Sequence, residues 1–378
     1  MWGGRFSEPP SDALWRFTVD HSDRRLLSDD ITGSLAHVAM LGDAGILEQA
    51  DVDAITTGLE EIRIESDEGQ FEFLETDEDV HSAVERRLYE LIGEPAGRLH
   101  TGRSRNDQIA LDIRLYLRRA ADERISDLQA FAGLMADRAE EIGDAVVPVY
   151  THLQQAQPIL LGEHFLAYGW MAVRDAERFA EVRQRLNVSP LGAGAAAGSS
   201  LPIDPSLTAA TLGFERAFDN SIDAVGSRDL VAEYVFCCAQ AMTHLSRLAE
   251  EVVLWSTSEF GWITLDDAYA TGSSALPHKK NPDIAELTRG KAASVAADVV
   301  TLLGIQKGTP LAYNRDLQED KRAVFHADDS LAAALPALGG LLATAAFHVP
   351  EPDSRTVALD IAEALVRKGV PFREAHEA

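Results

Sequence analysis

The sequence predicts a mainly all-α protein, built around an elongated central bundle of long helices with smaller helical regions toward the two ends of the chain. Two observations lead to this prediction. Apolar residues recur at steps of three and four through several long stretches that hold few prolines, which is the pattern of amphipathic helices. Runs that alternate between apolar and polar residues, as half-buried strands do, are few.

The chain divides into three predicted parts. Residues 1–102 form a mostly helical N-terminal domain, in which the run Phe-Glu-Phe-Leu at 71–74 is the best candidate for a strand of a short hairpin arm. Residues 103–350 form the central bundle. Residues 351–378 follow a linker with two prolines, hold one helix over about 355–368, and form the start of a C-terminal helical domain that we expect to be incomplete in this chain.

The longest predicted helix of the bundle covers residues 106–142. No proline occurs in it, and at 1.5 Å per residue it would be roughly 55 Å long. Helices this long need partners to bury their apolar stripes, so we expect a bundle, and we expect other subunits to bury some of the stripes. Further long helices are predicted over 163–186, 228–260, 283–303 and 318–347, the last with a kink at Pro336.

The charge balance argues against several kinds of partner. The chain has 61 Asp and Glu against 34 Lys and Arg, a formal net charge of −27. Such a surface repels phosphate backbones and anionic bilayers, so we expect neither a nucleic acid nor a membrane as partner. Only six of the basic residues are Lys. Many acids with few lysines predict a halophilic protein, because concentrated salt screens the self-repulsion.

Cysteine content and the N-terminal sequence indicate the compartment. The two cysteines, Cys237 and Cys238, are adjacent, and neighbours on a helix point in different directions, so we expect no disulfide between them. Two thiols without a disulfide framework fit a reducing cytoplasm. The first ten residues have neither the basic nor the apolar region of a signal peptide. We therefore expect a cytoplasmic protein.

Four polar segments interrupt the helical pattern, and each concentrates reactive groups. Residues 101–107 combine two Arg with hydroxyls at a helix N-terminus, a combination that binds carboxylates. Residues 150–158 place His152 among hydroxyl and amide groups, where it can act as a general acid or base. Residues 271–282 bring Ser and Lys together, as an activated base or an anion clamp requires. Residues 310–321 are rich in charged and amide side chains.

Each segment also has a purely structural explanation. The first could be a helix cap, with Asn106 as the capping residue and Asp107 satisfying the helix dipole. His152 could be a structural histidine, the segment 271–282 a surface loop, and the segment 310–321 a solvated face of salt bridges. Taken one at a time, the segments leave these alternatives open.

Two other kinds of site are not predicted. The glycine-rich run at 192–198 has the spacing GxGxxxG rather than GxGxxG, and no strand precedes it, so it does not indicate a dinucleotide site. The sequence has no HExxH motif and no Cys/His cluster with ligand spacing, so no metal site is predicted.

Together the polar segments resemble the fumarase/aspartase superfamily of lyases. The stretch GSSALPHKKNP at 272–282 is similar to the mobile catalytic loop of that superfamily. Within the superfamily, the resemblance is to the argininosuccinate lyase family, and its motifs occur in order along nearly the whole chain. They are MWGGRF at 1–6, GRSRND at 102–107, THLQQAQP at 151–158, NSIDAVGSRD at 220–229, YNRDLQEDK at 313–321 and KGVPFREAHE at 368–377.

The resemblance implies reversible β-elimination of argininosuccinate to arginine and fumarate, as in arginine biosynthesis. It also implies a homotetramer in which each active site combines segments of three subunits. No cofactor or metal is expected, because the carboxylate of the substrate acidifies the proton that is removed.

The resemblance also implies a role for each site residue. Ser273 would be the base, Lys279 would stabilise the dianionic intermediate, and Asn281 would hold the same carboxylate. His152 would act on the leaving nitrogen and pair with Glu286. The expected substrate-binding residues are Arg103, Ser104, Arg105, Asn106 and Thr151 for the succinyl carboxylates, and Tyr313, Gln318 and Lys321 for the arginine end.

Some positions depart from the family pattern, and alternatives remain. The family usually has Ser-x-x-x-Asp near the N-terminus; Asp23 fits, but Val19 stands at the Ser position unless Asp20 replaces it. An adenylosuccinate lyase-type enzyme should have a further basic cluster for phosphate, which the sequence lacks. A crystallin-like structural protein on the same fold would not need the reactive residues of the four segments.

Overall fold

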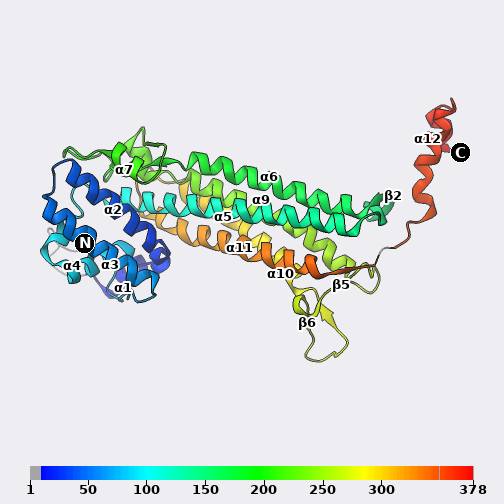
Figure 1. The fold of residues 1–378 in the computed structure, drawn as a ribbon, viewed down its shortest axis with the longest axis horizontal. Coiled ribbons are helices and arrows are strands. Elements are labelled where there is room, and N and C mark those ends of the chain that lie inside the picture. The colour runs from blue at the N-terminus through cyan, green and yellow to red at the C-terminus, as the bar shows by residue number, and fades with distance from the viewer. Residues whose placement is uncertain (1–9, 349, 378) are drawn as a thin grey trace. The chain divides into compact units, whose positions relative to one another are not determined.

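The structure, a computed structural model, describes residues 10–348 and 350–377, so the motif at 1–6 lies outside the described residues. The chain forms two compact units. The first comprises Met1–Ala121, Glu181–Tyr234 and Val300–Phe325, and the second comprises Asp122–Ala180, Val235–Val299 and His326–Ala378. Five long helices contribute residues to both units (Figure 1): α5 (Arg105–Ile142), α6 (Leu161–Arg185), α9 (Asp229–Trp255), α10 (Asp283–Gln306) and α11 (Asp320–Thr344).

The predicted fold class is confirmed. Helices dominate, and the strands in the described part of the chain form only two-stranded sheets. The start of α5 differs by one residue from the prediction, and α11 continues through Pro336 as one helix. Helix α9 ends at Trp255 rather than at residue 260, because the chain then turns back and the Trp262 amide donates to the Trp255 carbonyl at 2.9 Å.

The first unit contains a small helical core of its own. Helices α2, α3 and α4 pack through buried aliphatic residues such as Ile31, Ile55 and Leu88. Helix α4 begins with a capping box, in which Asp79 and Ser82 bind each other's backbone amides. The elements of this unit, besides its parts of the long helices, are α1 (Asp12–Thr18), η1 (His21–Leu26), α2 (Leu27–Asp43), α3 (Gln49–Asp67), α4 (Val80–Ile92), η2 (Glu94–Arg98), β3 (Val188–Ser189), α7 (Pro205–Thr211), β4 (Arg216–Ala217), α8 (Ser221–Gly226) and η4 (Arg315–Glu319).

The predicted strand at residues 71–74 is wrong. These residues have no strand partner; instead Phe71 and Phe73 pack against the core of α2, α3 and α4, with their rings edge to face at 4.9 Å. The alternation of apolar residues here reflects two rings that are buried against helices, not a sheet ladder.

The second unit holds a longer hairpin that the sequence analysis missed. Strand β1 (Val146–Thr151) pairs antiparallel with β2 (Gln154–Leu160). Next to the long helices, Trp255 stacks on Trp262 at 5.7 Å. The remaining elements are β5 (Ile263–Thr264), η3 (Asp267–Tyr269), β6 (Thr271–Gly272), β7 (Lys280–Asn281), β8 (Ala346–Phe347), η5 (Ser354–Val357), α12 (Ala358–Arg367) and α13 (Phe372–Glu377).

Two further expectations concern the helices. Cys237 and Cys238 are both buried in α9, and no disulfide joins them, as predicted. None of the helices in the described residues has an apolar stretch long enough to cross a membrane. The three-part division of the sequence stays a prediction.

Candidate active site

The N-terminus of α5 is fixed by its own side chains. Ser104 caps the helix: its Oγ accepts a hydrogen bond from the Asn106 amide at 3.2 Å, and its amide donates to Asp107 Oδ1 at 2.9 Å. Asn106, which the sequence suggested as the cap, instead donates through Nδ2 to the carbonyl of Ala195 at 3.0 Å. The capping frees the Asn106 side chain to contact a second segment of the chain.

The glycine-rich run binds this helix end. The amides of Gly192 and Gly194 each donate to Asp107 Oδ2 at 2.9 Å, and both glycines have positive φ. Backbone amides in such turns favour an anion. Here the anion is the fully buried carboxylate of Asp107, so the run holds the helix terminus.

A cavity of about 140 Å³ lies in the first unit beside this helix end. Several polar side chains converge on it, as they do in ligand-binding sites. The residues that line it include these predicted substrate-binding residues: Asp23, Arg105, Asn106, Tyr313, Gln318 and Lys321. The sequence analysis did not assign the other lining residues to the site: Asp20, Glu78, Asp79, His81, Ile109 and Arg315, of which Asp20 was an alternative to Val19.

The segment 313–321 is attached to the N-terminal helices by long-range hydrogen bonds. Arg315 and Gln318 both donate to the carbonyl of Thr18, at 2.8 and 3.0 Å. Just before Tyr313, Ala312 has a φ of 65°, and its carbonyl lies so close to Gly226 that a Cβ there would be 2.6 Å from the oxygen. The turn that delivers Tyr313 to the cavity therefore depends on a glycine.

Lys321 is held by a buried network. Its Nζ donates to Asp320 Oδ1 at 2.8 Å, and Arg228 Nε donates to Asp320 Oδ2 at 2.6 Å. Burial acts to raise the pKa of Asp320, but the two cations outweigh it and lower the pKa overall. One carboxylate thus faces two cations, and the network has a net positive charge beside the cavity.

Three acidic residues, Asp23, Asp79 and Glu85, determine the charge on the other side of the cavity. Burial raises the pKa of Asp23 to about 6, although His81 opposes the shift. Arg105 donates to Asp79 Oδ1 at 2.7 Å and to Glu85 Oε2 at 3.1 Å. The Arg105 guanidinium lines the cavity and is neutralised by these partners in this structure.

Two predicted substrate-binding residues of the first unit, Arg103 and Ser104, do not line the cavity. Arg103 is buried and donates from Nη1 to Ser34 Oγ at 2.9 Å. Ser104 caps α5, as described above. Ser104 directly precedes Arg105, which lines the cavity, and Arg103 lies two positions before it. The structure gives both residues a structural contact.

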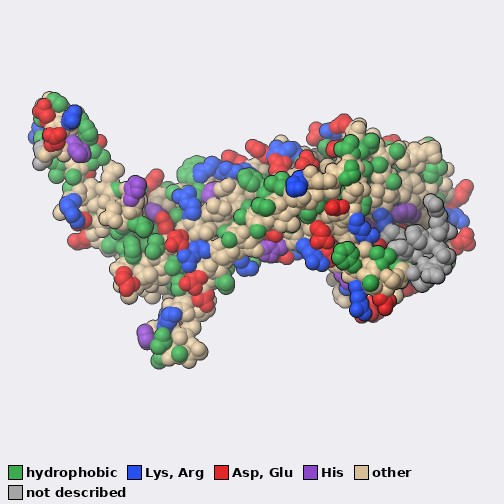
Figure 2. All heavy atoms as spheres, turned by 180° about the vertical axis from the view of Figure 1, so that it is seen from behind, with side chains coloured by type: hydrophobic (Ala, Val, Ile, Leu, Met, Phe, Trp, Pro, Cys, Tyr) green, Lys and Arg blue, Asp and Glu red, His purple; other side chains and the backbone are tan. Residues whose placement is uncertain are grey.

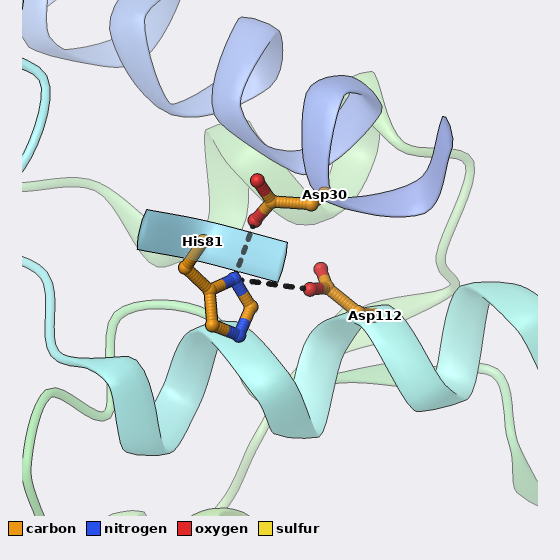
Figure 3. Close-up of side chains that lie close together, drawn as sticks. All are labelled: Asp30, His81 and Asp112. Carbon is orange, nitrogen blue, oxygen red and sulfur yellow. Dashed lines mark hydrogen bonds and ion pairs between the residues drawn. The ribbon is translucent and has the colours of Figure 1, made fainter. Parts of the chain in front are cut away.

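A buried cluster under the cavity joins three helices (Figure 3): Asp30 from α2, His81 from α4 and Asp112 from α5. His81 Nδ1 lies 2.8 Å from Asp30 Oδ1 and 3.6 Å from Asp112 Oδ2. Burial opposes charge on all three, yet the ion pair lowers the pKa of Asp30 and raises that of His81. Burial and repulsion from Asp30 raise the pKa of Asp112 well above its usual range.

Residues of these types can bind a divalent cation. In this structure the Nδ1 atom of His81 faces both carboxyl groups, and the charge of Arg103 acts to lower the pKa of each of them. No sequence motif could have found the cluster, because Asp30 and His81 lie 51 positions apart.

The second unit contains the hairpin turn with His152. The turn has two residues, His152 and Leu153, with φ of 55° and 56°, between the paired residues Thr151 and Gln154. Positive φ at both central positions is the type I′ pattern, which usually contains Asn and Gly. His152 and Leu153 adopt it at a steric cost, and such strain is common at functional sites. Thr151 and His152 are both exposed.

The second unit also contains the segment 271–282, whose ends form the short β6–β7 pair. Ser273, two residues into the segment, is half-buried and accepts hydrogen bonds through Oγ from the amides of Ala275 and Leu276, at 3.3 and 3.1 Å. The exposed Lys279 and the half-buried Asn281 lie at its other end. Figure 1 shows β6 and the β1–β2 hairpin at separate places on this unit.

Glu286 lies in the first turn of α10 and is exposed. In the described residues, no hydrogen bond or ion pair joins Glu286 to His152. The predicted residues therefore form two sets, one at the cavity of the first unit and one on exposed segments of the second.

Comparison with known proteins agrees with the motif evidence. A family model described as lyase matches residues 4–297, and one described as argininosuccinate lyase C-terminal matches residues 355–378. The argininosuccinate lyase of Symbiobacterium thermophilum is 51% identical over 387 residues, covering 100% of this chain and 83% of that relative. The chain belongs to the argininosuccinate lyase family. It is accordingly a lyase.

Further relatives extend this result. The argininosuccinate lyase of Frankia casuarinae is 49% identical, with 100% of this chain and 83% of the relative covered. Among solved structures, an EDDS lyase in complex with formate has a TM-score of 0.82 at 31% identity, covering 96% of this chain and 72% of that one. A delta crystallin-type fumarate lyase from Brucella melitensis, bound to cobalt, has a TM-score of 0.79 at 20% identity, covers 99% of this chain and 85% of that one, and shares the fold.

Proposed function

We propose that this chain cleaves argininosuccinate reversibly to arginine and fumarate, as a step of arginine biosynthesis. The observation that carries the proposal is the identity of about half of the residues, over the full length of this chain, with relatives that are named argininosuccinate lyase. The cavity supports it, because the segments 105–106 and 313–321 meet there.

The proposed chemistry is a β-elimination. Ser273 removes the proton next to a carboxylate, and the guanidinium nitrogen leaves. The difficult species is the dianionic aci-carboxylate, which fixed positive charge and hydrogen-bond donors stabilise electrostatically. In the proposal Lys279 and the amides of the turn at 272–274 supply that field, and Asn281 holds the same carboxylate.

The other residues bind the substrate or serve the leaving group. His152, paired with Glu286 in the assembled site, acts as the acid or relays the proton to the leaving nitrogen. Arg103, Ser104, Arg105, Asn106 and Thr151 bind the succinyl carboxylates, and Asp23, Tyr313, Gln318 and Lys321 bind the arginine end or its surroundings.

A homotetramer with shared sites would bring the two sets of residues together. Large apolar side chains on the long helices are exposed in the single chain, among them Trp170, Phe236 and Leu287 at 63%, 49% and 63%. Figure 2 shows apolar side chains lying among the charged ones on one face of the chain. Burying side chains like these against other copies would stabilise an assembly by about 25 cal/mol per Å² of apolar surface.

We also place the enzyme in the cytoplasm of a salt-rich cell. The net charge of −27 favours function in salt, where self-repulsion is screened. Activity and the melting temperature should both rise with KCl. A melting temperature that is flat or falling between dilute and molar KCl would remove the halophilic part of the proposal.

The first test measures fumarate release by its ultraviolet absorbance, with argininosuccinate and adenylosuccinate supplied in parallel in molar KCl. Release from argininosuccinate alone is expected. Release from adenylosuccinate alone would assign the other substrate, and release from neither would contradict the proposal.

Variants test the roles. Ser273→Ala should assemble normally and lose several orders of magnitude in kcat; activity within about tenfold of the parent would remove Ser273 from the base role. Mixing inactive Ser273→Ala and Arg105→Ala chains should restore part of the activity, because some mixed sites then hold both intact residues. If mixing and reassembly restore nothing, the shared-site assembly is wrong.

A further inference from the structure

Two adjacent glycines, Gly339 and Gly340, lie in the last two turns of α11, where glycine is less favourable than alanine. Their surroundings differ. A Cβ on Gly339 would lie 3.3 Å from Leu134 Cδ2, an end of a flexible side chain. A Cβ on Gly340 would lie 2.6 Å from both Cε1 and Cζ of Tyr269 and closer still to its Oη, a separation that real Cβ atoms do not show. Gly340 therefore leaves a notch in α11 that the Tyr269 ring fills.

Tyr269 is the last residue of η3 and stands two residues before the segment 271–282. The start and the end of that segment are fixed close to the same short helix. Lys280 pairs with Asp267 of η3, and Thr271 Oγ1 donates to Asp283 Oδ2 at 2.5 Å. The antiparallel pairing of β6 with β7 holds the start of the segment against its end. Figure 1 shows β6 projecting from the long helices of this unit.

These contacts have different strengths. Both side chains of the Lys280–Asp267 pair are exposed, and exposed ion pairs contribute little to stability. The β6–β7 ladder is only two residues long on each side. The half-buried Tyr269 ring packs on a helix backbone that cannot move without disturbing α11. Among the described contacts at the base of the segment, the ring in its notch is the one with a rigid partner.

We propose that the Tyr269–Gly340 contact is the fixed pivot of the segment 271–282, which makes Tyr269 and Gly340 positioning residues for Ser273. This inference rests on the proposed function for its kinetic consequence, but its structural consequence is independent of it. Three residues separate Tyr269 from Ser273, so a shift of the ring is passed to the serine through a short piece of chain. A displacement of about 1 Å in a reacting group can cost roughly 100-fold in rate.

The test compares Gly340→Ala with Gly339→Ala in the full chain. Both substitutions replace glycine by alanine in the same helix and give the same gain in helix propensity, so the two variants differ only in the atoms that the new methyl group meets. Gly340→Ala should lower kcat about tenfold or more and change KM by less than about threefold. Gly339→Ala should keep kcat within about twofold of the parent. Equal kcat values for the two variants would overturn the proposal.

A second readout does not depend on catalysis. A lysine-specific protease should cut Gly340→Ala faster at Lys279 and Lys280 than it cuts the parent or Gly339→Ala, with the sites identified from fragment masses. If the protease cuts Gly340→Ala faster but the parent does not cleave argininosuccinate, the pivot is supported and the proposed function is refuted. Unchanged cutting would count against the pivot even in an active enzyme.

Tyr269 variants keep the proposal falsifiable if Gly340→Ala does not fold. Tyr269→Ala should lower kcat and speed proteolysis as Gly340→Ala does. Tyr269→Phe, which keeps the ring, should have kcat and a proteolysis rate close to those of the parent. In the Tyr269→Ala background, Gly340→Ala should add no further loss, because the ring it displaces is gone. Full additivity of the two effects, or a Tyr269→Ala variant that behaves like the parent, would refute the contact as the pivot.

Discussion

Replacing Asp107 by alanine should destabilise the first unit more than any surface change on the same helix. The Asp107 carboxylate is fully buried and accepts hydrogen bonds from three backbone amides, those of Ser104, Gly192 and Gly194, each at 2.9 Å. Alanine leaves all three donors without this acceptor. A buried donor that loses its acceptor costs about 1–3 kcal/mol, so three give about 3–6 kcal/mol once some rehydration is included. The burial that raises the pKa of Asp107 reduces the loss slightly, because a desolvated charge also disappears.

Urea denaturation in molar KCl measures this effect, since urea leaves the ionic strength unchanged. The control is Asp137→Ala, an exposed aspartate on the same helix, which should stay within about 0.5 kcal/mol of the parent. The free energy of unfolding of Asp107→Asn should lie between those of the two alanine variants, because the side-chain amide oxygen of asparagine can still accept hydrogen bonds from some of the backbone amides. If the free energies of unfolding of Asp107→Ala and Asp137→Ala differ by less than about 1 kcal/mol, the Asp107 carboxylate does not anchor the glycine-rich run at 192–198.

Three further substitutions test other parts of the structure. Asp23→Asn should raise the free energy of unfolding by up to about 3 kcal/mol near pH 8 and hardly at pH 4. The pKa of Asp23 in the folded state, about 6, exceeds the usual 3.8, so protonated Asp23 favours folding, and ionised Asp23 destabilises the folded state as the pH rises through 6. An equal gain in stability at both pH values would contradict this reasoning. Leu153→Gly should raise the melting temperature, because glycine relieves a left-handed residue that costs about 1 kcal/mol; an unchanged or lower value would mean that the turn is not strained. Gly226→Ala should raise KM about tenfold, because the new methyl group pushes the Ala312 carbonyl, and Tyr313 with it, away from the cavity. A KM equal to that of the parent would show that the turn at Ala312 can shift without moving Tyr313.

The long helices could be predicted from the sequence because their signal is repeated many times. In α5 the apolar spacing persists for ten turns, and the prediction differs from the structure by one residue. The β1–β2 hairpin was missed because its second strand is rich in Gln and its turn, His152–Leu153, lacks the Asn-Gly signature. The run at 71–74 was misread for the opposite reason, because its two phenylalanines have strand spacing but pack on helices.

The candidate site was predictable where its residues lie within one motif. The residues Tyr313, Gln318 and Lys321 share one short segment, and all three line the cavity. His81 could not be assigned, because its partners Asp30 and Asp112 come from two other helices and no local spacing links them. The run at 192–198 was excluded as a nucleotide site by its spacing, but only the structure shows that its amides bind Asp107.

The attachment of the segment 313–321 to the N-terminal helices also bears on when the cavity can form during synthesis. Gln318 donates to the carbonyl of Thr18, a residue 300 positions earlier in the chain. At about 5–20 residues per second, roughly 15–60 s pass between the synthesis of these two residues. Throughout that time the acidic wall with Asp23 exists without the basic segment that carries Lys321. A ribosome-bound chain should therefore acquire the α2–α3–α4 core early, while the cavity forms only after residues 313–321 have been synthesised.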